Sequence, residues 1–421
     1  MPEATIYSAS WLVSPHAAPL SGGAILVCDG VITAMGSLKE LRRDHAAASV
    51  VDYPGCAILP GFVNAHTHLE LSHFSAWRLR THVDYNPRSF VDWIIQLIKI
   101  KRGLKAEDYV ASVNGGMRMC LEAGTTAVGE IVGNPSLASL YRTSLLSGRL
   151  FVELFGHDPA TFHSLLDHAV ETGSVGMSAN FAAGLSPHAT YTISDENLLL
   201  IREIALSHNL PLSIHISESP AETDFIFDSS GPLAEMLYPF VNWERYLMPP
   251  RRYSSTQLLD RVGLLTASTL AIHCVHVTLA DALILKERGV SVALCPRSND
   301  CLDVGRAPVA MLKKLRIPLA LGTDSLASND SLSLWDEMRF AMDTFPQELS
   351  PLDVFQMVTS NAAAALGISS TSGSLEPVKR ADFQVVGDVG DVAEKVLERA
   401  ISKGQLHEVY AAGRRYTGMA N

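Results

Sequence analysis

Short apolar runs alternate with longer segments of helical character through most of this 421-residue chain. Each run is rich in branched and small apolar residues, as is typical of a buried strand. Strands that alternate with helices form a parallel sheet, and eight such units close into a barrel. We therefore predict an α/β fold with a (β/α)8 barrel over residues 58–374. The eight expected strands are residues 58–66, 126–132, 149–156, 178–188, 211–217, 269–275, 290–296 and 318–324.

The two ends of the chain are β-rich and differ in texture from the middle. Residues 1–57 contain short runs such as ATIYSASWLV, and residues 375–421 contain ADFQVVGD and HEVYAAGRRYTG. Two all-β pieces at opposite ends of a chain can complete a single domain. We expect residues 1–57 and 375–421 to pack together as a small β-sandwich domain beside the barrel.

Composition argues against several classes of partner. The net charge is −11, and no basic stripe is visible, so we expect no nucleic-acid partner. No window approaches the roughly 20 apolar residues that cross a bilayer, and the N-terminus has no basic segment followed by an apolar one. We therefore expect no membrane partner and a cytoplasmic location. The six cysteines include no CxxC pair, which favours reduced thiols.

Three histidines and one aspartate stand at the ends of expected strands. Because side chains alternate along a strand, His66 and His68 share one face of the first strand. The same alternation places His215 on the inner face of the fifth strand and Asp324 at the rim of the eighth. Three imidazoles and a carboxylate at the carboxyl end of a barrel suit one Zn²⁺ ion, with Fe²⁺ as the second choice.

Two further residues could move protons beside such a metal. Alternation along the sixth strand points His273 inward, and Glu218 follows directly after the end of the fifth strand. A carboxylic acid near a metal-bound water is what a hydrolase needs for proton transfer, and Asp324 could also accept the proton of that water. No lysine occurs between Lys105 and Lys286, which argues against two metals bridged by a carboxylated lysine.

The strings LPGFVNAHTHLELS, HISES, HCVH, CPRSN and LGTDSLASN resemble the amidohydrolase superfamily, and within it the branch of aromatic deaminases and chlorohydrolases. The resemblance covers nearly the whole chain, and it implies that Glu218 and His273 transfer protons. It further implies that His188, in LSPHATY, contacts the base, although family members often have proline where this chain has Thr190. The implied metal ligands are His66, His68, His215 and Asp324. The expected substrate contacts are His188, Glu70, Glu153 and Arg297.

A small heteroaromatic substrate is expected, and the resemblance is greatest to aminodeoxyfutalosine deaminases. It implies an adenine-type nucleoside that loses ammonia, within menaquinone biosynthesis. The benzoate carboxylate of aminodeoxyfutalosine would favour an arginine, for which Arg297, Arg251 and Arg252 are candidates. Deamination of S-adenosylhomocysteine, guanine or a pterin, dechlorination of a triazine, and a non-catalytic scaffold stay open. The apolar helix around Trp93 could be a pocket wall or the contact of a homodimer.

Overall fold

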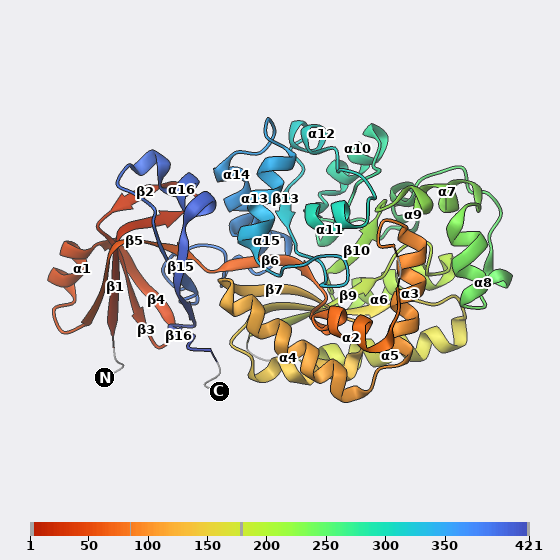
Figure 1. Ribbon diagram of the computed structural model, residues 1–421, viewed down its shortest axis with the longest axis horizontal. Helices are drawn as coiled ribbons and strands as arrows, with labels where there is room; N and C mark the ends of the chain where they lie inside the picture. Colours follow the sequence, from red (N-terminus) through yellow and green to blue (C-terminus); the bar gives the residue numbers. More distant parts are fainter. Residues whose placement is uncertain (1–3, 85, 177–179, 419–421) are drawn as a thin grey trace.

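The computed structural model describes residues 4–84, 86–176 and 180–418, and Figure 1 shows their arrangement. Of its two eight-stranded sheets, one is parallel, with its strands paired in chain order. A parallel bridge between Thr67 and Asp324 joins the first strand to the end of the last, so the sheet closes as a barrel. The strands are β6 (Phe62–Thr67), β7 (Thr125–Val132), β8 (Ser147–Leu154), β9 (Phe181–Pro187), β10 (Leu212–Ile216), β11 (Thr269–His273), β12 (Ser291–Leu294) and β13 (Leu319–Leu321).

Each of the eight predicted runs overlaps one barrel strand, so the predicted barrel is confirmed. The first strand starts at Phe62 instead of residue 58, because the chain up to Pro60 belongs to the other sheet, which is mixed. Residues 178–179 of the fourth predicted run lie outside the described residues.

Helices and short turns of helix connect the strands and cover the barrel, where their apolar side chains form the largest core cluster. The α-helices are α1 (Leu38–Asp44), α2 (Phe74–Thr81), α3 (Phe90–Arg102), α4 (Ala106–Glu122), α5 (Pro159–Gly176), α6 (Asp195–Ser207), α7 (Pro220–Asp228), α8 (Tyr238–Phe240), α9 (Ser255–Val262), α10 (Leu279–Arg288), α11 (Pro296–Cys301), α12 (Val309–Lys314), α13 (Leu334–Thr344), α14 (Pro351–Met357), α15 (Ser360–Ala365) and α16 (Val396–Lys403). The 3₁₀-helices are η1 (Leu69–Leu71), η2 (Pro135–Thr143), η4 (Glu244–Tyr246) and η5 (Ala393–Lys395), and η3 (Leu233–Leu237) is a π-helix.

Both ends of the chain build the second sheet, which is mixed and has eight strands in the order β16-β15-β14-β5-β1-β3-β4, with β2 paired to β1. Figure 1 shows its red N-terminal strands beside the blue C-terminal ones. The second domain that was expected from both ends is therefore present, as one hydrogen-bonded sheet where two packed sheets were expected. Its strands are β1 (Thr5–Ser14), β2 (Ala17–Ser21), β3 (Gly23–Cys28), β4 (Val31–Ser37), β5 (Ser49–Pro60), β14 (Phe383–Gly387), β15 (Gln405–Ala411) and β16 (Arg414–Arg415).

Separate apolar clusters cover the two faces of β1. Ile6 packs with Leu41 of α1 on one face, and Tyr7 packs with Phe383 and Tyr410 on the other.

The domain boundaries at 57/58 and 374/375 stay predictions. All six cysteines are free thiols, and no helix of the described residues is long and apolar enough to cross a membrane.

Candidate active site

A cavity of about 570 Å³ opens at the carboxyl ends of the barrel strands. It brings together most of the side chains that the sequence singled out, and His66 is fully buried beside them. Its polar lining includes His68, Glu70, Glu153, His188, His215, Glu218, His273 and Asp324. Its apolar lining includes Phe90, Trp93, Ile94, Leu97 and Ile98 of α3, and Leu237, Val241 and Trp243. The apolar helix that the sequence left open is thus a wall of this cavity.

The four candidate metal ligands converge at this end of the barrel. The Nε2 atoms of His66 and His68 lie 3.2 Å apart, and Asp324 Oδ1 is 3.7 Å from the first and 3.6 Å from the second. The imidazole of His215 has its centroid 5.0 Å from that of His66. His273 is also close to His66 and His215, so it lies within reach of the same ion.

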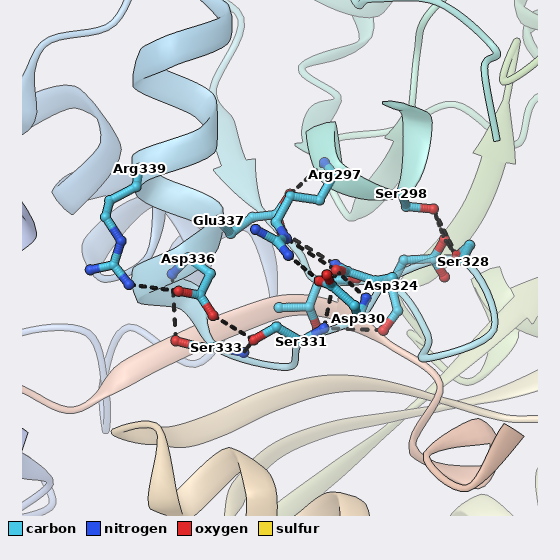
Figure 2. A network of polar contacts seen from close by, with 12 residues as sticks. Arg297, Ser298, Asp324, Ser328, Asp330, Ser331, Ser333, Asp336, Glu337 and Arg339 are labelled. Atoms are coloured by element: carbon cyan, nitrogen blue, oxygen red, sulfur yellow. Dashed lines mark hydrogen bonds and ion pairs between the residues drawn. The ribbon is translucent and has the colours of Figure 1, made fainter. Parts of the chain in front are cut away.

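Hydrogen bonds orient these ligands as a metal ion requires. His215 Nδ1 lies 2.7 Å from the carbonyl oxygen of His188, so it donates there and leaves Nε2 free. Asp324 Oδ2 accepts hydrogen bonds from the hydroxyls of Ser298 and Ser328 at 2.6 and 3.0 Å (Figure 2). These bonds leave Asp324 Oδ1 facing His66 and His68. The three nitrogens and one oxygen therefore fit a divalent ion such as Zn²⁺ or Fe²⁺.

Burial also keeps two of these imidazoles in the form that binds metals. The pKa values of His68 and His215 fall well below the ordinary histidine value, because burial disfavours the charged form. Burial raises the pKa of Asp324, but the hydrogen bond from His66 and the neighbouring imidazoles outweigh it, so this pKa falls well below its usual value.

Glu218 and His273 form a second pair beside the candidate metal ligands. His273 Nε2 is 3.5 Å from Glu218 Oε1, and His273 Nδ1 is 2.9 Å from Asn299 Oδ1. Burial, and then the charge of Asp324, raises the pKa of Glu218 well above its ordinary value, and burial lowers the pKa of His273 to about 4. A protonated carboxylic acid and a neutral imidazole are thus available at neutral pH for proton transfer.

The backbone around these side chains adopts uncommon conformations. Ser217, His273, Cys274 and Asp324 all have φ between +50° and +68°, in the left-handed region that non-glycine residues rarely occupy. Such conformations are held in place by the surrounding structure and occur often at active sites. They turn the chain at the ends of β10, β11 and β13, where the candidate catalytic side chains are presented.

Glu130 of β7 fixes the end of β6 and was not singled out from the sequence. Its carboxylate accepts hydrogen bonds from the Thr67 hydroxyl, the Leu69 backbone N–H and the Tyr141 hydroxyl at 3.0, 2.9 and 2.7 Å. These bonds hold the residues on either side of His68. The sequence of β7 does not reveal this role. All eight of its residues are buried, so no alternation of polar and apolar residues singles out Glu130.

Glu70, Lys101 and Glu153 give the cavity a charged patch. Lys101 Nζ lies 2.8 Å from Glu70 Oε1, and both residues line the cavity with Glu153. Burial raises the pKa of Glu153 to about 7, although the charge of Lys101 opposes the shift. The sequence suggested both glutamates, but not Lys101, because its contact depends on how α3 packs across the barrel.

His188 lies on the same cavity, where the resemblance placed it. Its Nδ1 is 3.2 Å from the Thr192 hydroxyl oxygen, and burial, followed by the charge of Lys101, lowers its pKa to about 4. A neutral imidazole at this position can exchange hydrogen bonds with a heteroaromatic ring.

The three arginines suggested for a substrate carboxylate are not brought to this cavity. Arg297 donates from Nε to Asn329 Oδ1 at 3.1 Å and pairs with Asp330, as Figure 2 shows, and it lines a separate cavity. Arg251 pairs with Asp195, and Arg252 pairs with Asp228. Each guanidinium is thus already engaged by a carboxylate elsewhere.

Comparison with known proteins identifies the family of the chain. A model of the family described as "Amidohydrolase family" matches residues 57–415, which is most of the chain. The chain belongs to the amidohydrolase family. The resemblance seen in its motifs is thereby confirmed, and the protein is a hydrolase that acts on carbon–nitrogen bonds.

Several characterised relatives are similar over most of their length. The chain is 30% identical to an aminodeoxyfutalosine deaminase of Deinococcus radiodurans over 77% of both chains. It is also 30% identical to a 5-methylthioadenosine/S-adenosylhomocysteine deaminase of Syntrophobacter fumaroxidans, over 89% of this chain and 82% of the relative.

Among solved structures, a zinc-bound adenosine deaminase from Xanthomonas campestris superposes with a TM-score of 0.82 at 26% identity, covering 99% of this chain and 93% of that one. The aminofutalosine deaminase of Helicobacter pylori also has a TM-score of 0.82, covering 98% of this chain and all of the other. Its identity of 21% shows the fold alone.

Proposed function

We propose that this amidohydrolase removes the amino group of an adenine-type nucleoside by hydrolysis and releases ammonia. The pair of Glu218 and His273, 3.5 Å apart and buried beside the candidate metal ligands, carries this proposal. The relatives point the same way, because they are named as deaminases of aminodeoxyfutalosine, 5-methylthioadenosine/S-adenosylhomocysteine and 5'-deoxyadenosine.

The candidate ligands His66, His68, His215 and Asp324 would hold one Zn²⁺ ion, or Fe²⁺ as the second choice. Such an ion lowers the pKa of a coordinated water from about 15.7 towards 7 and so makes a nucleophile available at neutral pH.

The protein's own residues would then transfer the protons. Asp324 takes a proton from the attacking water, which His273 orients. Glu218 gives its proton to the ring nitrogen beside the amino-bearing carbon, which neutralises charge in the tetrahedral adduct. The adduct then breaks its bond to the amino group, which leaves as ammonia with the proton that Asp324 holds. The proton of the remaining hydroxyl returns to Glu218 as the carbonyl forms, so both carboxyl groups end as they began. Proton transfer by a group such as Glu218 typically contributes about 10²–10⁴-fold in rate.

Among adenine nucleosides we favour aminodeoxyfutalosine, and with it a place in menaquinone biosynthesis. The apolar wall of α3 suits a large substituent on the sugar, since most of a ligand's surface is buried in sites of this kind. Two cations line the cavity among the described residues, Lys101 and Arg102. Arg102 lies 4.8 Å from the Phe240 ring centroid, which leaves its guanidinium edge for a substrate carboxylate, in place of Arg297.

An ammonia-release screen on the zinc-loaded enzyme tests the proposal. The panel holds aminodeoxyfutalosine, adenosine, 5'-deoxyadenosine, methylthioadenosine, S-adenosylhomocysteine, guanine, a pterin and a chlorotriazine. We expect ammonia from adenine nucleosides. Ammonia from guanine or the pterin alone, or chloride from the triazine alone, would contradict the proposal and support another amidohydrolase reaction. Glu218→Gln should lower turnover about 10²–10⁴-fold while one equivalent of metal stays bound.

A second experiment tests whether the enzyme prefers a substrate that carries a carboxylate. Arg102→Met should weaken turnover of aminodeoxyfutalosine much more than that of adenosine, because only the first carries a carboxylate. Arg297→Met is the matched control and should change neither. Equal losses for both substrates in Arg102→Met would remove the argument for the carboxylated substrate.

A further inference from the structure

Glu222 is the third residue of α7, and its carboxylate has no part in the proposed deamination. Its side chain is fully buried, and no ion pair to it is found among the described residues. Oε1 accepts a hydrogen bond from the Ser217 N–H and Oε2 accepts one from the Glu218 N–H, both at 2.9 Å. Burying a carboxylate without a cation beside it costs free energy, so hydrogen-bond donors around it are needed to offset that cost.

The turn that Glu222 holds is the one that presents Glu218. Ser217 has φ of +52°, a left-handed conformation that a serine does not favour by itself. It stands between the strand that carries His215 and the candidate acid Glu218. Because the two hydrogen bonds reach the N–H groups of Ser217 and Glu218, the carboxylate fixes the direction in which the Glu218 side chain leaves the backbone.

The same carboxylate is tied to two other segments of the site. The Ser255 hydroxyl, at the first residue of α9, donates to Glu222 Oε1 at 2.5 Å. Thr190 Oγ1 lies 2.9 Å from Ser255 Oγ and 3.4 Å from Glu222 Oε1. Thr190 follows His188 by two residues and replaces the proline that is frequent in the family. Its hydroxyl therefore connects the segment of His188 to the segment of Glu218.

We propose that Glu222 is a positioning residue for Glu218, and that Ser255 and Thr190 complete a buried network which sets Glu218 against His188 across the cavity. This inference rests on the proposed function, in which Glu218 is the acid. It gives the long connection between β10 and β11 a role, because that connection supplies both Glu222 and Ser255. Placement errors of about 1 Å at a reacting group can lower a rate about 100-fold.

Glu222→Gln tests the proposal with little change in volume. The new amide N–H₂ must face one of the two backbone N–H donors, so the turn loses a hydrogen bond and gains a repulsive contact. On the best substrate of the screen, we expect kcat to fall about 10–100-fold with KM within about twofold and metal content unchanged. An unchanged kcat per bound metal would overturn the proposal.

A double-mutant cycle separates positioning from general damage to the fold. If Glu222 acts through Glu218, then adding Glu222→Gln to Glu218→Gln should cost less than about twofold more in kcat. Multiplied losses in the double variant would show an independent, structural effect. Thr190→Val, which removes one hydroxyl of the network, should lower kcat about threefold with KM unchanged. If Glu222→Gln does not fold, Thr190→Val still tests the proposal, and an unchanged kcat in that variant would overturn it.

Amide hydrogen exchange gives a readout that needs no substrate. In Glu222→Gln, or in Thr190→Val if the former does not fold, the amides of Ser217 and Glu218 should exchange about tenfold faster, while those of β12 keep the wild-type rate. Wild-type exchange at both amides would overturn the proposal. Faster exchange in an enzyme that releases no ammonia from any nucleoside would contradict the proposed function and leave the turn's dependence on Glu222 standing.

Discussion

Single hydroxyl groups orient the candidate metal ligands, and Ser298 is the clearest case. Its Oγ lies 2.6 Å from Asp324 Oδ2 and keeps Oδ1 directed at His66 and His68. Ser298→Ala should leave the fold intact and weaken zinc binding about 10–100-fold, because a carboxylate ligand that loses its outer hydrogen bond is less well oriented. Competition with a chelator of known affinity measures the change.

The matched control for Ser298 lies in the same polar network. Ser331 donates to Asp336 at 2.6 Å and does not touch Asp324 (Figure 2). Ser331→Ala should therefore keep wild-type zinc affinity. If both variants bound zinc as tightly as the wild type, the orientation of Asp324 would not depend on Ser298.

At the scale of elements, His157 anchors the segment from α8 to η4 that carries part of the cavity wall. Its ring stacks on Tyr246 with centroids 5.1 Å apart and meets the edge of Trp243 at 4.7 Å. The Tyr238 hydroxyl donates to Tyr191 O at 2.9 Å, so its oxygen accepts from His157 Nε2 at 3.1 Å. Burial, and then the charge of Arg251, lowers the pKa of His157 to about 4.

Acid should therefore weaken this part of the fold. Below pH 6.5 the unfolded state binds a proton at His157 that the folded state does not bind until about pH 4, so stability is lost across that window. Protonation of His157 in the unfolded state lowers the free energy of unfolding by roughly 3 kcal/mol at the acid end of this window, and it has no effect above pH 6.5. Between pH 7 and 4, thermal unfolding of the wild type should lose more stability than that of His157→Phe. Parallel losses in the two proteins would contradict this account.

Elements were predicted well from the sequence wherever a local pattern decided them. Alternation along short strands is a local pattern, so it was enough to predict that His68, His215 and Asp324 face the cavity that they line in the structure. Arg297 shows the limit. It follows β12 closely, but the first turn of α11 carries its side chain to Asn329 and Asp330 instead of the cavity. The sequence shows how many residues separate Arg297 from the end of β12. It does not show in which direction the following helix carries the Arg297 side chain.

The polar contacts missed from the sequence join elements that are far apart in the chain. Lys101 reaches Glu70 from α3, and Glu130 reaches Leu69 across the β6–β7 pair. Asn299 meets His273 through the packing of α11. Each needs a long-range arrangement that neither periodicity nor motif encodes. The motifs identified the candidate catalytic and metal-binding residues, and the structure added the residues whose contacts hold these candidates in place.

At the scale of the whole molecule, the candidate metal site lies where the barrel closes. The backbone N–H of Asp324 donates to His66 O at 3.1 Å, so the first and last strands meet directly at two of the four ligands, and His215 joins them from β10. A bound ion would link three strands that are distant in sequence. Binding to the folded state alone stabilises it by about 4 kcal/mol when the free ion is at 1,000 times its dissociation constant.

Removal of the metal should thus lower the stability of the entire barrel. We expect chelator-treated protein to unfold at a lower Tm than zinc-restored protein, with a difference that grows with free zinc. Asp324→Ala, which removes one ligand at the closure, should unfold at nearly the same Tm with and without zinc. Calorimetry on both proteins, with the metal content measured in parallel, makes the comparison. If the wild type lost one equivalent of zinc and kept its Tm, the ion would have no part in closing the barrel.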